Sequence, residues 1–486
     1  MNLNTLKQLS KSGSIDLNPR KAELIRERRE MENFLAKSTD PLVYGIHTGF
    51  GPHAFLSNES TEHVQKSLVY HLTVEKVFDS TGNPKNAITH EEARAVLAAR
   101  IHSLSLGGSG ISFETLEILN HLLGEDCIPI LPERGSLSAS GDLIPLSYIA
   151  LALMGESHWT GIGKEKAPSV LYPKKTQIPG LPWTPQAKEA ISITNGTTFT
   201  TALLGLQILR LRSYLNLTLE ILEFLFSYHK VFPTAFLPSL HTKKKFLGPV
   251  YVSEKLYPVI SRNPKLKIPQ KRIQDQYSVR CVPQILGSIF DELDQITDVV
   301  ESELNSLSDN PVFLGEYEGF AEGGNFYASQ VSFSVDRMQN LFAVYSTWME
   351  RFLNYLYNPQ ENGEFPLMLS PNPGKDAGLS GLGLLATHIT ADIRRDSMPA
   401  SVQSIPSNGN NQDIVPMGAI GVLRNRRSLN SLRKLLGIFC YTVLQTSYLT
   451  NQKDLPKILK GLSPLSEDRS LYEEIQILED RIQSIE

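Results

Sequence analysis

Four long segments of the chain repeat apolar residues at the spacing of an α-helix. They cover residues 198–228, 286–307, 330–357 and 422–449. In the second segment, seven apolar side chains form one wide stripe, and most of the acidic side chains fall outside it. Helices of this length with an apolar face need partners to cover that face. The pattern therefore predicts a bundle of long helices.

Strand signals are scarce along the rest of the chain. Hairpin sequences are few, and strands and helices do not alternate regularly, so we expect short, peripheral strands and a mainly α fold. Proline and glycine at residues 161–185, 232–249 and 361–378 indicate long loops. We expect residues 1–190 to form an N-terminal layer of shorter elements. Residues 191–486 would then form the central long-helix bundle and the C-terminal helices.

Composition and charge exclude several classes of protein. The 486 residues are 41% hydrophobic and 20% charged, as in ordinary globular proteins. With 47 basic and 51 acidic residues, the net charge of −4 provides no field that would gather nucleic acid or an anionic membrane. The most apolar stretch, residues 197–209, is shorter than the roughly 20 residues that a membrane span requires. We expect a cytoplasmic protein whose partners are small molecules or copies of itself.

Cysteine and histidine give no sign of a metal site. The three cysteines lie far apart, with neither disulfide nor zinc-ligand spacing. The eleven histidines include no pair at ligand spacing with a carboxylate on one helix face. We therefore expect no metal.

The segment GSLSASGD, residues 135–142, carries the most chemical information. Glycine at position 141 leaves its backbone nitrogen unobstructed, so that nitrogen could attack the carbonyl carbon of Ala139. Loss of water, together with dehydration of Ser140, would give a methylidene-imidazolone ring. Taken alone, Ala-Ser-Gly is a common tripeptide that usually forms a turn or a helix cap. The interpretation therefore depends on the rest of the chain.

This segment and several others resemble the motifs of the aromatic amino acid lyase family, in the family's order and over most of the chain. That family includes histidine, phenylalanine and tyrosine ammonia-lyases and related aminomutases. The other motifs are YGIHTGFGP (44–52), ITNGT (193–197), QDQYSVRCVPQILG (274–287), SDNP (308–311), GGNF (323–326) and NNQDIVPMG (410–418). The resemblance implies a homotetramer in which each active site draws on three subunits.

The resemblance also implies roles for single residues. Ala139, Ser140 and Gly141 would form 4-methylidene-imidazol-5-one autocatalytically, as the electrophile for the substrate amine. Tyr44, as phenolate, would remove the β-proton; because a phenol has a pKa near ~10, its pKa must be lowered or the enzyme must favour alkaline pH. Arg280 suits a bidentate grip on the substrate carboxylate. The family places Asn195 and Tyr277 beside the ring and amine, Asn310 near the carboxylate, Gln274 beside Tyr277, and Phe326 against the ring.

Two positions bear on the choice of amino acid. The pair His71-Leu72 resembles the tyrosine type, and an imidazole can hydrogen-bond a phenol. Gln412, which follows Asn411, matches a glutamate of histidine lyases, so a neutral amide here disfavours an imidazole substrate. The sequence predicts a tyrosine ammonia-lyase that releases trans-p-coumarate. A phenylalanine or histidine ammonia-lyase, an aromatic aminomutase, and a helical assembly protein without the ring remain alternatives.

Overall fold

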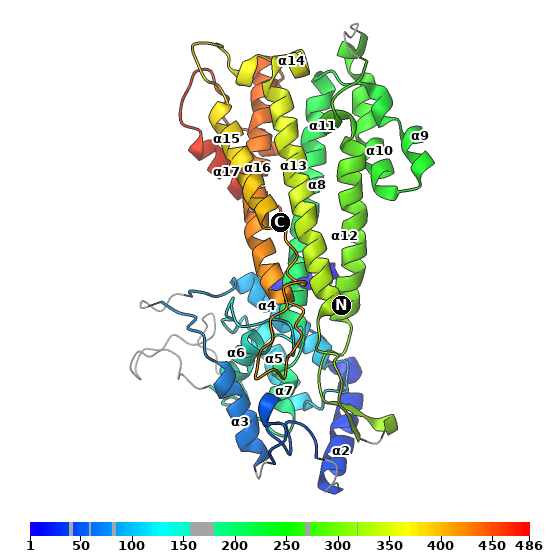
Figure 1. Ribbon diagram of the computed structural model, residues 1–486, viewed down its shortest axis with the longest axis vertical. Helices are drawn as coiled ribbons and strands as arrows, with labels where there is room; N and C mark the ends of the chain where they lie inside the picture. Colours follow the sequence, from blue (N-terminus) through cyan, green and yellow to red (C-terminus); the bar gives the residue numbers. More distant parts are fainter. Residues whose placement is uncertain (38–41, 58–59, 80–83, 156–178, 268–272, 318) are drawn as a thin grey trace. The chain divides into compact units, whose positions relative to one another are not determined.

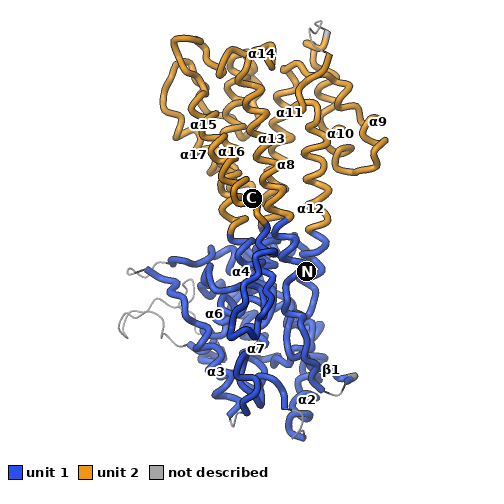
Figure 2. The backbone as a smooth tube through the Cα atoms, in the orientation of Figure 1, with its two compact units in different colours: residues 1–206, 297–336, 399–423 blue, residues 207–296, 337–398, 424–486 orange. Residues whose placement is uncertain are grey.

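The computed structural model describes residues 1–37, 42–57, 60–79, 84–155, 179–267, 273–317 and 319–486. Contacts divide the chain into two compact units, each built from three segments (Figure 2). Unit 1 comprises residues 1–206, 297–336 and 399–423, and unit 2 comprises residues 207–296, 337–398 and 424–486. These are divisions by contact in the folded chain; a domain boundary between residues 190 and 191 stays a prediction.

Unit 1 contains α-helices of 6 to 17 residues, most of them drawn from blue to cyan in Figure 1. Contacts between α1 and α4, α4 and α5, α6 and α7, and α3 and both α6 and α7 hold them together. The elements are α1 (Leu3–Lys11), η1 (Asn18–Arg20), α2 (Lys21–Lys37), η2 (Gly51–His53), α3 (Thr61–Leu72), α4 (His90–Leu104), α5 (Phe113–Gly124), α6 (Leu143–Met154), α7 (Glu189–Thr194), β1 (Val312–Leu314), η6 (Gly315–Tyr317) and β2 (Gly319–Ala321).

Helix α4 is buried on all sides within unit 1. It begins with a capping box, in which the Thr89 hydroxyl accepts from the backbone N–H of Glu92 and the Glu92 carboxylate accepts from the N–H of Thr89. Its charged residues Arg94 and Arg100 are buried as well, because their guanidinium groups donate to backbone carbonyls of neighbouring segments. The helix therefore positions other segments through polar contacts as well as through packing.

The described strands form one small antiparallel hairpin. Val312 pairs with Ala321 and Leu314 with Gly319. Phe320 packs edge to face against Phe313 and against Phe34 of α2, and the Phe34 and Phe313 rings pack in a tilted arrangement; the ring centroids are 5.4 to 6.1 Å apart. The short, peripheral strands that the sequence predicts are confirmed.

Unit 2 contains most of each long helix (Figures 1 and 2). Within it, the Phe226 ring of α8 lies 6.2 Å from the Phe352 ring of α13, and Trp348 of α13 lies 5.9 Å from Phe439 of α16. The elements are α8 (Thr198–Tyr228), η3 (Pro233–Phe236), α9 (Pro238–His241), η4 (Thr242–Lys244), α10 (Leu247–Arg262), η5 (Pro264–Lys267), α11 (Tyr277–Arg280), α12 (Val282–Leu304), α13 (Ser329–Tyr357), α14 (Pro359–Asn362), η7 (Leu367–Leu369), α15 (Ser380–Arg395), α16 (Gly418–Leu449), η8 (Lys457–Leu459) and α17 (Tyr472–Gln483).

The mainly α class and the four long helices predicted from the sequence are confirmed. The unit boundaries at residues 206, 296, 336 and 423 fall inside α8, α12, α13 and α16. No helix in the described part of the chain is long and apolar enough to span a membrane.

The long loops are predicted less well. The prediction of a loop at 232–249 is wrong in part, because η3, α9 and η4 lie in this range and α10 begins within it. Prolines at the start of η3 and α9 fit the first turn of a helix, where no amide hydrogen is needed. Most of the predicted loop at 161–185 lies outside the described residues.

Candidate active site

A cavity of about 1000 Å³ lies within unit 1. Its walls come from α3, from the segment around η2, from the loop before α6, and from residues near 310, 323 and 410. It thus brings together segments that are far apart in the sequence. The residues predicted for the site that line it are Tyr44, His71, Leu72, Ala139, Ser140, Gly141, Asn195, Asn310, Phe326, Asn411 and Gln412.

A buried carboxylate, that of Asp142, holds the loop before α6 in place by hydrogen bonds. Asp142 accepts hydrogen bonds from the hydroxyls of Ser136 (2.7 Å), Ser138 (3.2 Å) and Thr200 (2.8 Å), and from the Thr200 backbone N–H (2.9 Å). Burial raises the pKa of this carboxyl, and the four donors act in the opposite direction. Asp142 therefore ties both sides of the Ala139–Gly141 turn to the start of α8.

The turn itself needs an unusual backbone. Ser138 and Gly141 have φ of 58° and 69°, a region that favours glycine. A Cβ atom on Gly141 would lie 2.3 Å from the backbone nitrogen of Gly196, so only glycine fits there. The Gly141 N–H donates to the carbonyl oxygen of Phe326 at 3.0 Å. The backbone around residue 141 is therefore held closely by two other segments.

Both polar groups of Ser140 are bound by amide side chains. Asn195 Nδ2 donates to the Ser140 carbonyl oxygen at 3.1 Å, and Gln412 Nε2 donates to the Ser140 hydroxyl at 2.8 Å. The Ser407 hydroxyl donates to Gln412 Oε1 at 2.8 Å, which orients the amide with its nitrogen toward Ser140. This arrangement places one amide donor on the carbonyl oxygen and one on the hydroxyl oxygen of residue 140.

Arg100 fixes the segment that carries Asn195. Its guanidinium donates to the carbonyl oxygens of Ser192, Ile193 (3.1 Å) and Asn195 (2.8 Å). Burial lowers its pKa to about 10, and Asp309 and Asp142 act against that shift. The backbone of Asn195 is thus held from one side while its side chain reaches Ser140.

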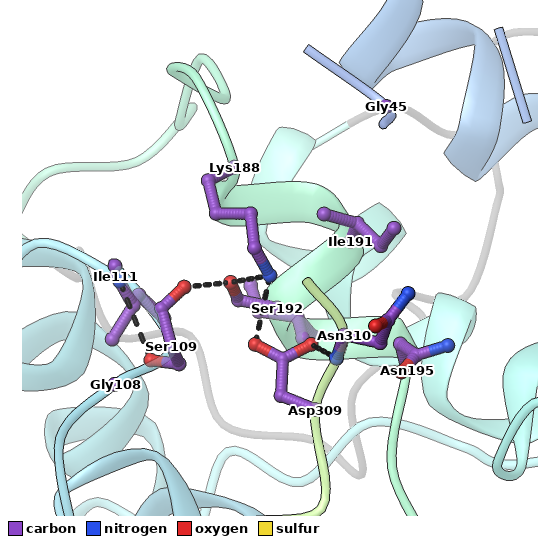
Figure 3. A network of polar contacts seen from close by, with 12 residues as sticks. Gly45, Gly108, Ser109, Ile111, Lys188, Ile191, Ser192, Asn195, Asp309 and Asn310 are labelled. Carbon is purple, nitrogen blue, oxygen red and sulfur yellow. Dashed lines mark hydrogen bonds and ion pairs between the residues drawn. The ribbon is translucent and has the colours of Figure 1, made fainter. Parts of the chain in front are cut away.

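A buried ion pair links the start of α7 to the segment before the hairpin (Figure 3). Lys188 Nζ lies 2.9 Å from Asp309 Oδ2 and 3.3 Å from the Ser192 hydroxyl, and both charged side chains are at most 1% exposed. The other carboxylate oxygen of Asp309 accepts the backbone N–H of Asn310 at 2.7 Å. The pair therefore fixes Asn310, which lines the cavity.

Tyr44 lies at the cavity with its hydroxyl bound to the protein. The Gly51 N–H donates to the phenol oxygen at 2.9 Å, and the ring packs edge to face on Phe50. Burial is the largest cause that raises the Tyr44 pKa; the Gly51 hydrogen bond lowers it and the charge of Glu322 raises it. The structure therefore shows no lowering of the pKa of this phenol, which was one of the two conditions for its expected role as a base.

His71 and Leu72 end α3 at the cavity wall. His71 Nδ1 lies 2.9 Å from the Ser67 carbonyl oxygen. A carbonyl only accepts, so Nδ1 carries the hydrogen and Nε2 of the neutral ring is left as an acceptor. Leu72 is buried and gives the same wall an apolar side.

Asn310 and Asn411 line the cavity, and hydrogen bonds to backbone groups hold the turns that carry them. Asn310 Oδ1 accepts the N–H of Gly323 at 2.7 Å, which connects the two ends of the β1–β2 hairpin. The Asn411 N–H donates to the carbonyl of Asn408 at 3.1 Å, in the turn that places Gln412.

Three predicted site residues form a separate cluster in unit 2. Arg280 Nη1 donates to Gln274 Oε1 at 2.7 Å, and its guanidinium carbon lies 4.6 Å from the centre of the Tyr277 ring. Tyr277 is 69% exposed. Neither Gln274, Tyr277 nor Arg280 is among the described residues that line the cavity.

Sequence reasoning missed several residues that support the site. Buried arginine within the apolar run of α4 was a detectable signal, because an unpaired buried charge is costly and must have partners. The ion pair of residues 188 and 309 joins positions too far apart for any pattern to show. The supporting residues not predicted are Arg100, Asp142, Lys188, Glu322 and Ser407.

The cavity combines a small-residue turn with positive φ, amide donors aimed at Ser140, and a phenol that could act as a base. No group of three or more His, Cys, Asp or Glu that could hold a metal ion occurs among the residues with described positions.

Comparisons with known proteins identify the family of the chain. The model of the aromatic amino acid lyase family matches residues 1–471. Histidine ammonia-lyase of Shouchella clausii (strain KSM-K16) is 30% identical over 427 residues, which cover 87% of this chain and 82% of that protein. Histidine ammonia-lyase of Staphylococcus aureus (strain JH9) is 31% identical over 438 residues, covering 89% and 83%.

Solved structures show the same fold. Tyrosine aminomutase from Streptomyces globisporus matches with a TM-score of 0.85 at 24% identity, covering 100% of this chain and 95% of that one. Phenylalanine aminomutase of Pantoea agglomerans matches with a TM-score of 0.82 at 23% identity, covering 99% and 96%. At this level of identity the likeness concerns the fold.

Proposed function

Because the chain belongs to the aromatic amino acid lyase family and is an ammonia-lyase, a class of carbon–nitrogen lyase, we propose that it eliminates ammonia from L-tyrosine to give trans-p-coumarate. Family membership sets aside the helical assembly protein without catalysis. The proposal adds a prosthetic group, a base, a substrate and an assembly, which the following observations support.

The residues of the turn fit formation of 4-methylidene-imidazol-5-one from Ala139, Ser140 and Gly141. The close packing of Gly141 against Gly196 holds the turn tightly, and the bond from Gln412 assists loss of the Ser140 hydroxyl. When present, the group would supply an electrophile for the substrate amine, which no ordinary side chain provides. Asn195 would hold the carbonyl oxygen of residue 140 by its hydrogen bond.

Tyr44 would remove the β-proton of the substrate. Its phenol oxygen already accepts one hydrogen bond, from the Gly51 N–H, and this bond becomes stronger when the oxygen carries a negative charge. The loss of the proton at the β-carbon and of ammonia at the α-carbon leaves the conjugated acrylate.

The observation that carries the choice of tyrosine is the orientation of His71. With Nδ1 donating to the Ser67 carbonyl, Nε2 is an acceptor at the cavity wall and suits the hydroxyl of a phenol. A buried hydroxyl without such a partner is costly, so the acceptor favours tyrosine over phenylalanine. Leu72 beside it contacts the apolar part of the ring.

Histidine is the second candidate substrate, because the curated relatives at 30–31% identity are named histidine ammonia-lyases. Gln412 argues against it, since a neutral amide lacks the negative charge that suits an imidazole. Two further alternatives remain, and the same assay distinguishes them. One is a phenylalanine ammonia-lyase, and the other is an aromatic aminomutase, which shares the ring and base but returns ammonia to the product.

Assembly into a homotetramer is part of the proposal. The described residues that line the cavity include no lysine or arginine, although an amino acid substrate brings a carboxylate. We propose that Arg280, with Gln274 and Tyr277, completes this site in another subunit, as in the family. Native mass measurement should give four chains, and a monomeric, fully active protein would contradict this part.

The test is turnover of L-tyrosine, L-phenylalanine and L-histidine, followed by released ammonia and by the acrylate product. We expect kcat/KM to be highest for L-tyrosine, and His71→Phe to reverse the order of tyrosine and phenylalanine. Intact mass should show a chain lighter by two waters, and Ser140→Ala should lose both this mass change and turnover while remaining folded. Preference for L-histidine would overturn the substrate but keep the lyase chemistry, and a β-amino acid product would indicate an aminomutase.

A further inference from the structure

The cavity holds a single carboxylate among its described lining residues, that of Glu322. The other ionisable side chains that line it are the phenol of Tyr44 and the imidazoles of His53, His63 and His71. Glu322 is therefore the acidic side chain of the described cavity wall.

The β1–β2 hairpin positions this carboxylate. Val312 pairs with Ala321, so Glu322 follows directly after the last paired residue of β2. The next residue, Gly323, donates its N–H to the side chain of Asn310 on the other side of the hairpin. Glu322 thus stands on a short, braced turn rather than at the tip of a long loop.

Glu322 also faces the proposed base. Its Oε1 atom accepts the backbone N–H of Tyr44 at 3.2 Å, whereas none of the described residues donates to Oε2. The side chain is exposed toward the cavity and has no lysine or arginine partner among the residues described. A group that donates to a carboxylate and brings positive charge is therefore missing from this part of the site.

An α-amino acid supplies such a group in its ammonium. We propose that Glu322 binds the α-ammonium of the incoming substrate and selects ligands that carry an amine. This inference rests on the proposed function, because it takes an aromatic amino acid as the ligand of the cavity. The position beside the Tyr44 backbone is suitable, since the amine and the β-carbon are separated by one carbon atom in the substrate.

The matched variants are Glu322→Gln and Glu62→Gln. The amide of Glu322→Gln retains an oxygen that can accept the Tyr44 N–H, so the brace remains and only the charge is removed. Glu62 lies on α3 in the same unit, pairs with Lys66, and is not among the residues that line the cavity. It controls for the loss of one negative charge elsewhere in the unit.

The experiment compares a ligand with an amine and one without it. For Glu322→Gln we expect KM for L-tyrosine to rise about tenfold, as for loss of one charged hydrogen bond, while inhibition by trans-p-coumarate is unchanged or stronger. Glu62→Gln should leave both values within about twofold, since exposed pairs contribute little. The inference would be overturned if KM for L-tyrosine were unchanged in Glu322→Gln, or if the binding of L-tyrosine and of trans-p-coumarate were weakened equally. Glu322 would then only hold the backbone of Tyr44 in place.

Failure of the proposed function is recognised separately. If the wild-type chain releases ammonia from none of the three aromatic amino acids, calorimetric binding of L-tyrosine and of trans-p-coumarate replaces the kinetic constants. Glu322→Gln should then weaken the binding of L-tyrosine but not the binding of trans-p-coumarate. Equal affinities of the variant and the wild type for L-tyrosine would reject the role of Glu322 in either case.

Discussion

Lys188→Met tests whether the buried ion pair in Figure 3 holds the site. Methionine keeps an unbranched chain of similar length but removes the ammonium, which lies 2.9 Å from Asp309 and 3.3 Å from Ser192. Asp309 then loses its ion-pair partner in a position where it is 1% exposed. Asp309 still accepts a hydrogen bond from the backbone N–H of Asn310, which lines the cavity. Any shift of Asp309 should therefore also change the shape of the cavity.

The expected loss follows from burial. Removing one partner of a buried ion pair costs about 3–5 kcal/mol, because the remaining charge is uncompensated. Burial lowers the pKa of Arg100 and the nearby charge of Asp309 opposes that shift, so Arg100 partly compensates the carboxylate and we expect the lower end, about 3 kcal/mol. In Lys188→Met/Asp309→Asn no charge is left unpaired, and the loss should be about 1–2 kcal/mol, as for lost hydrogen bonds.

Urea denaturation of the three variants and the wild type, followed by circular dichroism, measures these differences. We expect the double variant to be more stable than Lys188→Met, and kcat for L-tyrosine to fall in Lys188→Met more than in the double variant. A Lys188→Met protein as stable as the wild type would refute the argument, because burial would then not make this charge costly. A double variant less stable than Lys188→Met would refute it too.

Three further predictions concern the turn, the base and the amide. Gly141→Ala should destabilise the chain by about 1–3 kcal/mol and prevent loss of the two waters, because its Cβ would meet the Gly196 backbone nitrogen at 2.3 Å; denaturation and intact mass test this. Because burial raises the Tyr44 pKa, kcat/KM should keep rising with pH into the alkaline range, and a plateau reached below neutral pH would contradict a phenolate base. Gln412→Glu should slow the mass loss, since a carboxylate cannot donate to Ser140, and should raise kcat/KM for L-histidine relative to L-tyrosine.

The long helices could be predicted because their evidence is local. In α8 the predicted and observed ranges are both 198–228, and in α13 they differ by one residue at the start. Apolar residues that recur every three or four positions specify a helix whatever it packs against. The division into units depends on which parts of these helices contact each other, and no periodic pattern contains that information.

The residues that line the cavity were found from motifs rather than from periodicity. Eleven of the fourteen predicted site residues line it, and Gln274, Tyr277 and Arg280 lie together in unit 2. Glu322 and Ser407 were missed because each is an ordinary polar residue in a polar loop. Glu322 contacts Tyr44 only when distant segments meet, and Ser407 contacts Gln412 only when the local turn between them forms.

The short helix α7 explains why the supporting residues matter as much as the motifs. It has six residues, too few for a helix to be stable by itself, so its position must come from its contacts. Lys188 precedes its first residue and binds Asp309, while Asn195 follows its last residue and binds Ser140. Arg100 holds the carbonyls at its C-terminal end. Polar contacts at both ends of α7 therefore set the separation of two cavity asparagines, and a change in any of them should alter turnover before it alters the long helices.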